Sequence, residues 1–203
     1  CKRMDDGDFG AAAFTVRRPD GSVFCGDTPA PLHPCSYSCE SAGVLALLEA
    51  LIAQVDAWTV AHPAEQRPVK AVVFSDGQSW IAHAAVGPLN RAVWAPLFWA
   101  RLEALVLRVD RLTAAFMFAH CDDPEGDRVD TLAKHAFERF YARREATTPW
   151  HVDAARPCWQ RIRASAVTAL NAGEPFRSAY VGTALSAAAR VAPHFGRSSS
   201  HPD

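Results

Sequence analysis

The sequence predicts an α/β domain in which a mixed sheet carries helices on its faces, followed by a partly helical C-terminal extension. Two observations lead to this prediction. Apolar segments with the two-residue period of strands alternate along the chain with segments that have the period of helices. The length of 203 residues suits one α/β domain with a full core and an extension.

The first half of the chain predicts a hairpin, a long helix and a buried strand. Residues 10–17 are small, apolar and partly alternating, and the turn signal PDG at 19–21 leads to a return strand over 22–25. A helix opens at Ser36. Its inward face carries apolar residues at helical spacing, which are Val44, Leu47, Leu48, Leu51 and Val55. Residues 69–74 (VKAVVF) predict the buried strand.

The second half continues this alternation. Its predicted elements, in order, are a short helix over 78–87, a helix over 93–110, a strand over 113–119, a helix over 126–144 and a helical segment over 150–170. Residues 173–203 are rich in Ala, Ser, Arg and Pro, and we expect the end of this tail to be disordered. The predicted domain therefore covers residues 1–146, and the extension with its tail covers residues 147–203.

The composition excludes several classes of protein. The formal net charge is −1, so any binding to nucleic acid requires a local basic patch rather than bulk charge. No apolar run approaches the roughly 20 residues that span a membrane, and no signal peptide is evident. We therefore expect an intracellular protein without a membrane partner. The chain starts at Cys1 without an initiator methionine, so we expect it to be a segment of something longer.

The six cysteines predict free thiols rather than a metal site. Cys35 and Cys39 are the only close pair, and no second Cys pair or His pair stands at the spacing of zinc ligands. Free thiols are usual in a reducing compartment.

Three acidic side chains stand at positions that need an explanation. Glu40 lies one turn before Val44 in the apolar row of its helix, so it is expected to face inward. It either complements the helix dipole or serves a site. Asp76 and His120 follow the ends of two predicted strands, where open α/β sheets bind ligands, and Asp130 lies on the helix after His120.

Three blocks of sequence carry these residues in a familiar order. Residues 35–47 (CSYSCESAGVLAL) open the helix that contains Glu40, and residues 72–79 (VVFSDGQS) lead from an apolar strand into the turn at Asp76. Residues 120–134 (HCDDPEGDRVDTLAK) connect His120 to Asp130. Together the blocks resemble the signature of ribonuclease H domains. They are most similar to the domains carried by polyproteins of non-LTR retrotransposons, and residues 150–156 (WHVDAAR) resemble the segment that follows the domain in elements of the ingi type.

The resemblance implies a ribonuclease H-like mixed five-stranded sheet flanked by helices. It also implies a metal-dependent endoribonuclease that cleaves the RNA strand of RNA–DNA hybrids during reverse transcription. Carboxylates suit two Mg²⁺ ions, with Mn²⁺ as a possible replacement, and two ions stabilise both the attacking and the leaving oxygen. The metal ligands implied by the family are Asp6, Glu40, Asp76 and Asp130, and His120 is implied as a proton shuttle.

The resemblance also implies a cellular context. The expected partners are an RNA–DNA hybrid and a reverse transcriptase domain in the same polyprotein, and the expected location is the nucleus.

The sequence departs from the family pattern at three places, and at one of them Gly126-Asp127 replaces the more common Asn-Glu. Gly77 stands where Ser or Thr is usual. Only Asp6, in the segment Asp5-Asp6-Gly7-Asp8, is available as the first-strand acid, and residues 1–4 make a short polar strand. We therefore expect this strand either to begin upstream or to be eroded.

Two other functions compete with the nuclease. The first is a degenerate, catalytically inactive ribonuclease H-fold remnant that at most binds nucleic acid. The second is another nuclease of the same superfold, such as a junction resolvase, which the spacing from His120 to Asp130 disfavours.

Other side chains are expected to have structural roles or are left open. Trp80, Trp94 and Trp99 are expected in the core rather than on a base-stacking surface. The arginines at 139, 143 and 144 are equally compatible with phosphate contacts and with a solvated helix face.

Overall fold

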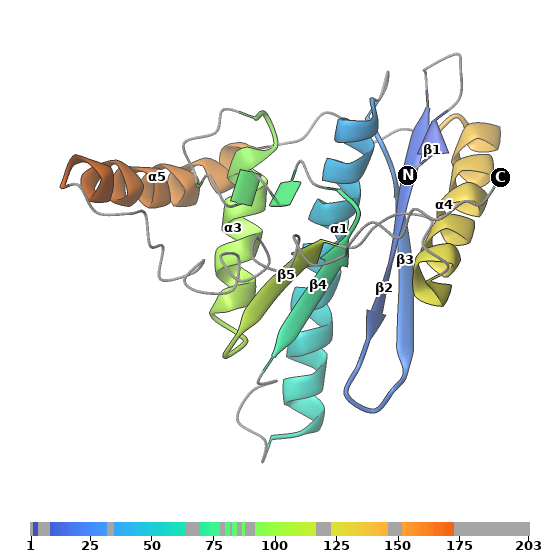
Figure 1. Ribbon diagram of the computed structural model, residues 1–203, viewed down its shortest axis with the longest axis horizontal. Coiled ribbons are helices and arrows are strands. Elements are labelled where there is room, and N and C mark those ends of the chain that lie inside the picture. Colours follow the sequence, from blue (N-terminus) through green and yellow to red (C-terminus); the bar gives the residue numbers. More distant parts are fainter. Residues whose placement is uncertain are drawn as a thin grey trace, which may run out of the picture.

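The computed structural model describes residues 2–3, 9–31, 35–63, 70–77, 80–81, 83–84, 87, 92–116, 123–145 and 152–172 (Figure 1). Its strands are β1 (Lys2–Arg3), β2 (Gly10–Arg17), β3 (Val23–Pro29), β4 (Ala71–Ser75) and β5 (Leu112–Phe116). Its helices are α1 (Ser36–Ala61), α3 (Ala95–Val106), α4 (Pro124–Arg143), the 3₁₀ turn η1 (Asp153–Ala155) and α5 (Arg156–Asn171). The fold is α/β, as predicted, and η1 and α5 follow α4 along the chain.

Two sheets organise the described strands. β1, β2 and β3 form an antiparallel sheet in that order, and β4 pairs with β5 in parallel. Within the described residues no ladder joins these two sheets, so the structure shows a three-stranded sheet and a two-stranded sheet in place of the expected five-stranded one. The hairpin between β2 and β3 turns through Gly21, whose φ of 82° favours glycine.

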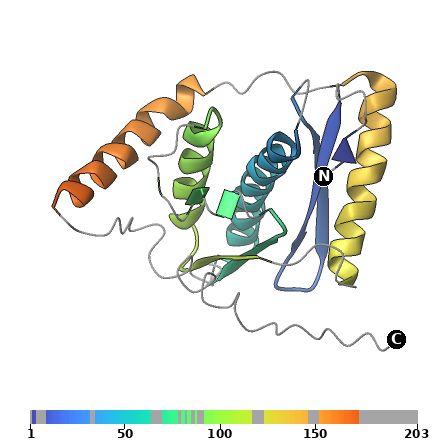
Figure 2. The same cartoon turned by 45° about the horizontal axis from the view of Figure 1, so that its top comes forward.

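Helices α1 and α4 lie on opposite faces of the sheet that contains β2 (Figures 1 and 2). A Cβ atom added at Gly43 of α1 would lie 2.8 Å from the Cβ of Ala12, so Ala12 faces α1. The neighbouring Ala11 belongs to a buried cluster with Phe137 and Phe140 of α4. Since successive side chains of a strand point to opposite faces, α1 covers one face and α4 covers the other.

The two helices also run in opposite directions along β2. Gln54, in the second half of α1, accepts a hydrogen bond from Arg18 at the end of β2 (2.8 Å). On the other face, Arg17 pairs instead with Glu125, in the first turn of α4. α1 is therefore parallel to β2, whereas α4 is antiparallel to it.

The main core lies between α1, α3 and the sheet of β4 and β5. Val44, Leu48 and Val55 of the predicted stripe are buried, and Leu47 and Leu51 pack against the same cluster. The tryptophans at 80, 94 and 99 are at most 4% exposed, so their predicted place in the core is confirmed. Ile162 of α5 joins this core, and α5 makes its main contacts with α3.

Helix α1 is unusually long and apolar. It has 26 residues and a mean hydropathy of 1.6 over its most apolar window, which is long and apolar enough for a membrane span by these two measures alone. The expectation of a protein without a membrane partner stays a prediction. In the structure α1 contacts β2, β3 and α3, and 22% of its most apolar window is buried.

The contact between Gly43 and Ala12 gives the first testable prediction. Gly43→Leu should lower the free energy of unfolding by about 3 kcal/mol, because the new side chain forces α1 away from β2. Ala53→Leu, which adds one carbon fewer at an exposed position of the same helix, should change stability by less than about 0.5 kcal/mol. Urea unfolding followed by circular dichroism measures both values. Equal effects of the two variants would contradict the close approach of α1 to the sheet.

Candidate functional site

The turn after β4 lies against the first turns of α1. Gly77 is buried, and a Cβ atom added to it would lie 3.1 Å from Oε2 of Glu40, 3.2 Å from Oγ of Ser75 and 2.9 Å from Cδ1 of Trp80. The hydroxyl of Ser75 accepts a hydrogen bond from the backbone N–H of Gly77 (3.0 Å), which fixes the turn. Glu40 thus lies beside the turn that contains Asp76, the second of the predicted acids.

Each element places its acid for a physical reason. Glu40 is half-buried because it precedes the apolar row of α1, as the sequence predicted. Asp76 is exposed because it is the first residue after β4, where the parallel strand ends. Gly77, the residue after Asp76, has no side chain, so its backbone lies close to the carboxylate of Glu40.

An aromatic cluster supports this turn from inside the core. The ring of Trp80 lies 6.4 Å from that of Phe98 on α3, and Phe98 lies 5.4 Å from Trp94. Tyr37, in the first turn of α1, packs on Trp94 at 5.8 Å. The cluster therefore connects the start of α1 with the turn after β4.

His83 is enclosed in this cluster. Its ring lies 4.5 Å from Trp94, 5.5 Å from Phe98 and 6.4 Å from Trp99, and the residue is 3% exposed. Neither ring nitrogen has a hydrogen-bond partner in the described structure. Burial lowers the pKa of His83 from its ordinary 6.5 to about 4, so the ring is neutral near pH 7.

The structure does not bring Asp130 to the other two acids. Asp130 lies on α4, which packs on the face of the β2 sheet opposite to α1, and the first turn of α4 lies at the far end of β2 from Glu40. Glu40 therefore lies beside the turn of Asp76, while Asp130 lies on the other face of the sheet, and the convergence of the three carboxylates stays a prediction. Phe137 and Phe140 anchor α4 against the start of β2, and this fixes the helix direction.

Two further predicted residues, Asp6 and His120, lie outside the described residues. Their assignments as the first-strand acid and the proton shuttle therefore remain predictions.

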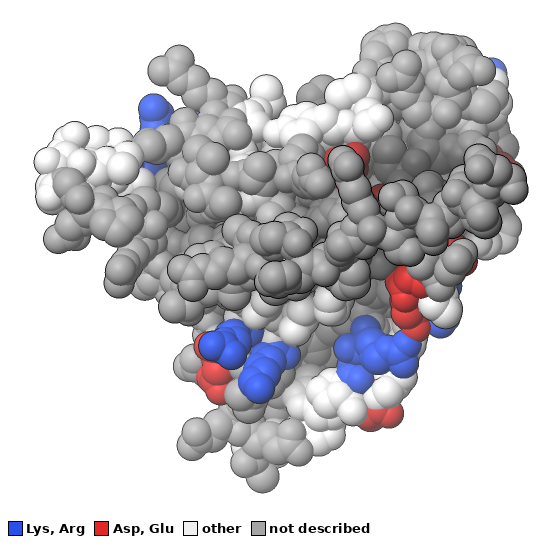
Figure 3. All heavy atoms as spheres, viewed as in Figure 1, with Lys and Arg blue, Asp and Glu red and all other residues white. Residues whose placement is uncertain are grey.

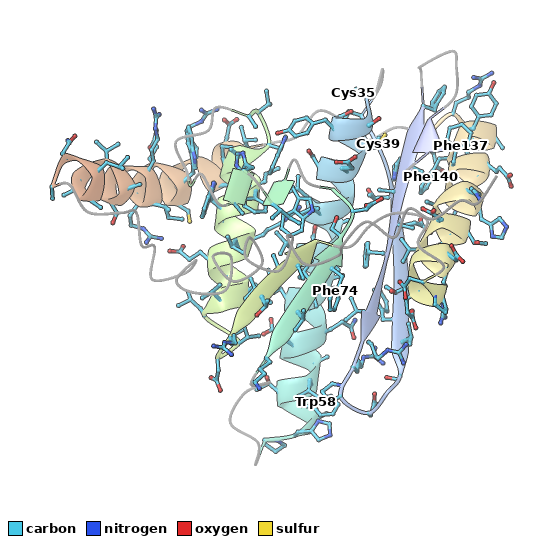
Figure 4. The ribbon with its side chains drawn as sticks, in the orientation of Figure 1. Cys35, Cys39, Trp58, Phe74, Phe137 and Phe140 are labelled. Atoms are coloured by element: carbon cyan, nitrogen blue, oxygen red, sulfur yellow. The ribbon has the colours of Figure 1, made fainter. Side chains whose placement is uncertain are left out.

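Two cysteines lie at the start of α1. Cys35 is exposed and Cys39 is buried, and both are free thiols (Figure 4). The backbone amide of Ser38 lowers the pKa of the Cys35 thiol, as expected for a thiol at a helix N-terminus. The prediction of free thiols is confirmed for the four cysteines that the structure describes, which are Cys25, Cys35, Cys39 and Cys158.

The arginines at the end of α4 contact neighbouring side chains. Arg139 pairs with Asp27 of β3 and covers the ring of Phe140, while Arg144 covers the ring of Tyr141. Arg143 lies 3.8 Å from Glu145. These contacts favour a structural role in a solvated helix face over phosphate binding.

The donors in this turn suit Mg²⁺ in kind. Carboxylate and hydroxyl oxygens are its preferred ligands, and it often takes only one or two protein carboxylates while retaining water. The described residues contain no group of three or more His, Cys, Asp or Glu side chains placed to hold an ion. Glu40 and Asp76 are therefore the residues that would hold one.

Three residues of this site were not predicted as functional from the sequence. Ser75 and Trp80 lie against the turn, and the absent side chain of Gly77 lets the turn lie close to Glu40. The sequence signal for Gly77 was its departure from the family pattern. No local signal marked Trp80, because its contact with the turn depends on packing between distant elements.

The space at Gly77 gives a second prediction. Gly77→Ala should lower the free energy of unfolding by about 1 kcal/mol, and Gly77→Val should lower it by about 2–3 kcal/mol, because each forces Trp80 or Glu40 to move. Denaturant unfolding measures the stability, and tryptophan fluorescence reports the movement of Trp80. Variants that match the parent in both measurements would show that the turn does not lie against Glu40.

No protein-family model matches this chain, and no curated protein sequence matches it.

Proposed function

We propose that this chain is a ribonuclease H-like, metal-dependent endoribonuclease that cleaves the RNA strand of RNA–DNA hybrids. The observation that carries the proposal is the placement of Glu40 beside the turn of Asp76, at the end of a parallel strand. This is where ligands bind in open α/β sheets, and hard oxygen donors at this position suit Mg²⁺.

The order of elements supports the same proposal. An antiparallel sheet of three strands, a long helix, a parallel strand pair and a later helix follow each other along the chain. We propose that the two sheets belong to one five-stranded ribonuclease H-like sheet. In this proposal Glu40 and Asp76 bind the metal, Mg²⁺ or Mn²⁺, and Asp6 on the first strand and His120 are further participants.

A second candidate function is favoured by the position of Asp130. An acid that packs across the sheet from Glu40 cannot complete a shared metal site in this arrangement. The alternative is therefore a ribonuclease H-fold remnant that has lost catalysis and at most binds nucleic acid.

One experiment separates the two functions. The full chain is incubated with a hybrid whose RNA and DNA strands carry different labels, in Mg²⁺, in Mn²⁺ and in EDTA. We expect metal-dependent cuts in the RNA strand and an intact DNA strand. A protein that is folded by circular dichroism but cuts neither strand in either metal would favour the remnant. Metal-dependent cutting of a four-way DNA junction, with the hybrid intact, would favour a resolvase.

A further inference from the structure

We propose that the outer face of β4 and β5 binds single-stranded nucleic acid through base stacking on Phe74. The face ends two residues before Asp76, and the proposal concerns binding and does not depend on catalysis. It is defined by Val72 and Phe74 of β4 and by Thr113 and Ala115 of β5, which pair with them in register.

The exposure of β4 alternates in an unusual way. Val73 is 5% exposed and faces the core, while its neighbours Val72 and Phe74 are 49% and 62% exposed. The outward face of a sheet strand in a soluble protein usually carries polar side chains. Two adjacent large apolar side chains on an open face are therefore a sign of a binding surface rather than of the core.

The shape of the face suits a flat ligand. The residue across from Phe74 is Ala115, whose short side chain leaves the phenyl ring open to approach. In Figure 4, Phe74 lies on β4, which passes in front of α1. An aromatic ring on a sheet surface stacks with an unpaired base, whose π-face is free, and does not stack with a base inside a duplex.

Basic side chains border one end of this face. Lys70 and Arg111 are exposed, precede β4 and β5, and lie side by side, since the carbonyl of Arg111 accepts the N–H of Ala71 at 2.7 Å. Neither forms an ion pair with a described residue. Figure 3 shows Lys and Arg gathered in two groups along the lower part of this view, one of them over the starts of these strands. The exposed Asp110 beside Arg111 reduces this positive charge without cancelling it.

These features together fit a short nucleic-acid segment better than a protein partner. Phe74 lies four positions after Lys70, which is about 13 Å along a strand. This distance leaves room for a few nucleotides between a phosphate contact and a stacked base. Because the whole chain has a net charge of −1, this local pair of cations is what attracts the phosphates.

The test measures the binding of labelled ten-nucleotide strands by fluorescence anisotropy. It uses the full-length Asp76→Asn variant in EDTA, so that loss of cleavage and loss of binding remain distinguishable. The probes are oligo-dT, oligo-rU and a DNA duplex. We expect both single strands to bind more tightly than the duplex, and Phe74→Ala to weaken their binding roughly 5- to 100-fold.

The contribution of Lys70 and Arg111 is measured separately, through the salt dependence of binding. Replacing Lys70 and Arg111 with Gln together should weaken binding and reduce the slope of log affinity against log salt by about 1.4, the effect of two phosphate contacts on a single strand. Lys134→Gln, an exposed lysine on α4, and Leu170→Ala, an exposed leucine on α5, should leave binding unchanged.

Three outcomes would overturn the proposal. One is unchanged binding in Phe74→Ala while circular dichroism shows an intact fold. Another is that the protein binds the DNA duplex as tightly as it binds the single strands. The third is a concentration-dependent dimer, seen by sedimentation, that Phe74→Ala abolishes, since this would identify a second copy of the chain as the occupant of the face.

Discussion

Cleavage of the RNA–DNA hybrid is expected to fall at least about 100-fold in the Asp76→Asn variant, with the fold unchanged. The substitution removes a charge that a metal ion needs and retains the shape of the side chain. Asp76 is exposed at the end of β4, so its replacement disturbs no packing. Initial cleavage rates with a labelled hybrid in Mg²⁺ measure the loss, and circular dichroism measures the fold.

The metal-free stability of this variant checks the same site independently of activity. Removing one carboxylate from beside Glu40 relieves repulsion, so Asp76→Asn should be at least as stable as the parent in EDTA. A clear loss of stability in EDTA would count against the site, as would retained cleavage.

Asp130→Asn is the matched control, because it makes the same chemical change on α4. We expect cleavage to persist in this variant, since α4 packs across the sheet from Glu40. If cleavage is lost in Asp130→Asn as fully as in Asp76→Asn, then α4 must reach the site in the active protein, and the helix direction described above is not the active one.

The second large effect concerns the stability of the fold in acid. The folded protein holds the pKa of His83 at about 4, whereas an unfolded histidine titrates near 6.5. Between pH 4 and pH 6.5 the unfolded chain binds a proton at this histidine and the folded chain does not. Above about pH 6.5 both states are neutral, and the free energy of unfolding is not reduced by His83. It falls as the pH drops toward 4, by about 3 kcal/mol in total.

The variant His83→Leu should remove this part of the acid dependence. The new side chain has a similar volume and needs no hydrogen-bond partner, so we expect it to be at least as stable as the parent at pH 7. Urea unfolding at pH 7, 5.5 and 4 should show the parent losing about 3 kcal/mol more than the variant. His135→Leu, at an exposed position of α4, should follow the parent. Parallel acid profiles for parent and His83→Leu would contradict the burial of a neutral ring.

Local patterns predicted the elements well because each element depends on neighbours in sequence. The alternation over 10–17 gave β2 with the same bounds, and the helical row that begins at Val44 gave the inward face of α1. The predicted helix over 93–110 is shorter in the structure, because a turn begins at Leu107 after Val106. The strand predicted over 69–74 is shifted slightly, to Ala71–Ser75.

The site was predictable only in part, because it depends on how distant elements pack. Glu40 and Asp76 stand where short-range patterns place them, on the first turns of a helix and at the end of a strand. The position of Asp130 depends instead on which face of β2 the helix α4 covers and on its direction. Those are set by Phe9 and Ala11 meeting Phe137 and Phe140, which are more than 120 residues away in the chain. A motif in sequence order does not contain this information.

The attachment of α5 has a consequence for how the molecule opens. α5 rests mainly on α3, through Ile162 and a bridge in which Glu103 accepts hydrogen bonds from Cys158 and Arg161. Its release breaks no strand ladder, whereas release of α1 separates it from both β2 and α3. Amide protons of α5 should therefore exchange with solvent as a group, through a partial unfolding event of lower free energy than the opening that exposes α1. Limited proteolysis should follow the same hierarchy and cut within α5 before the remaining domain.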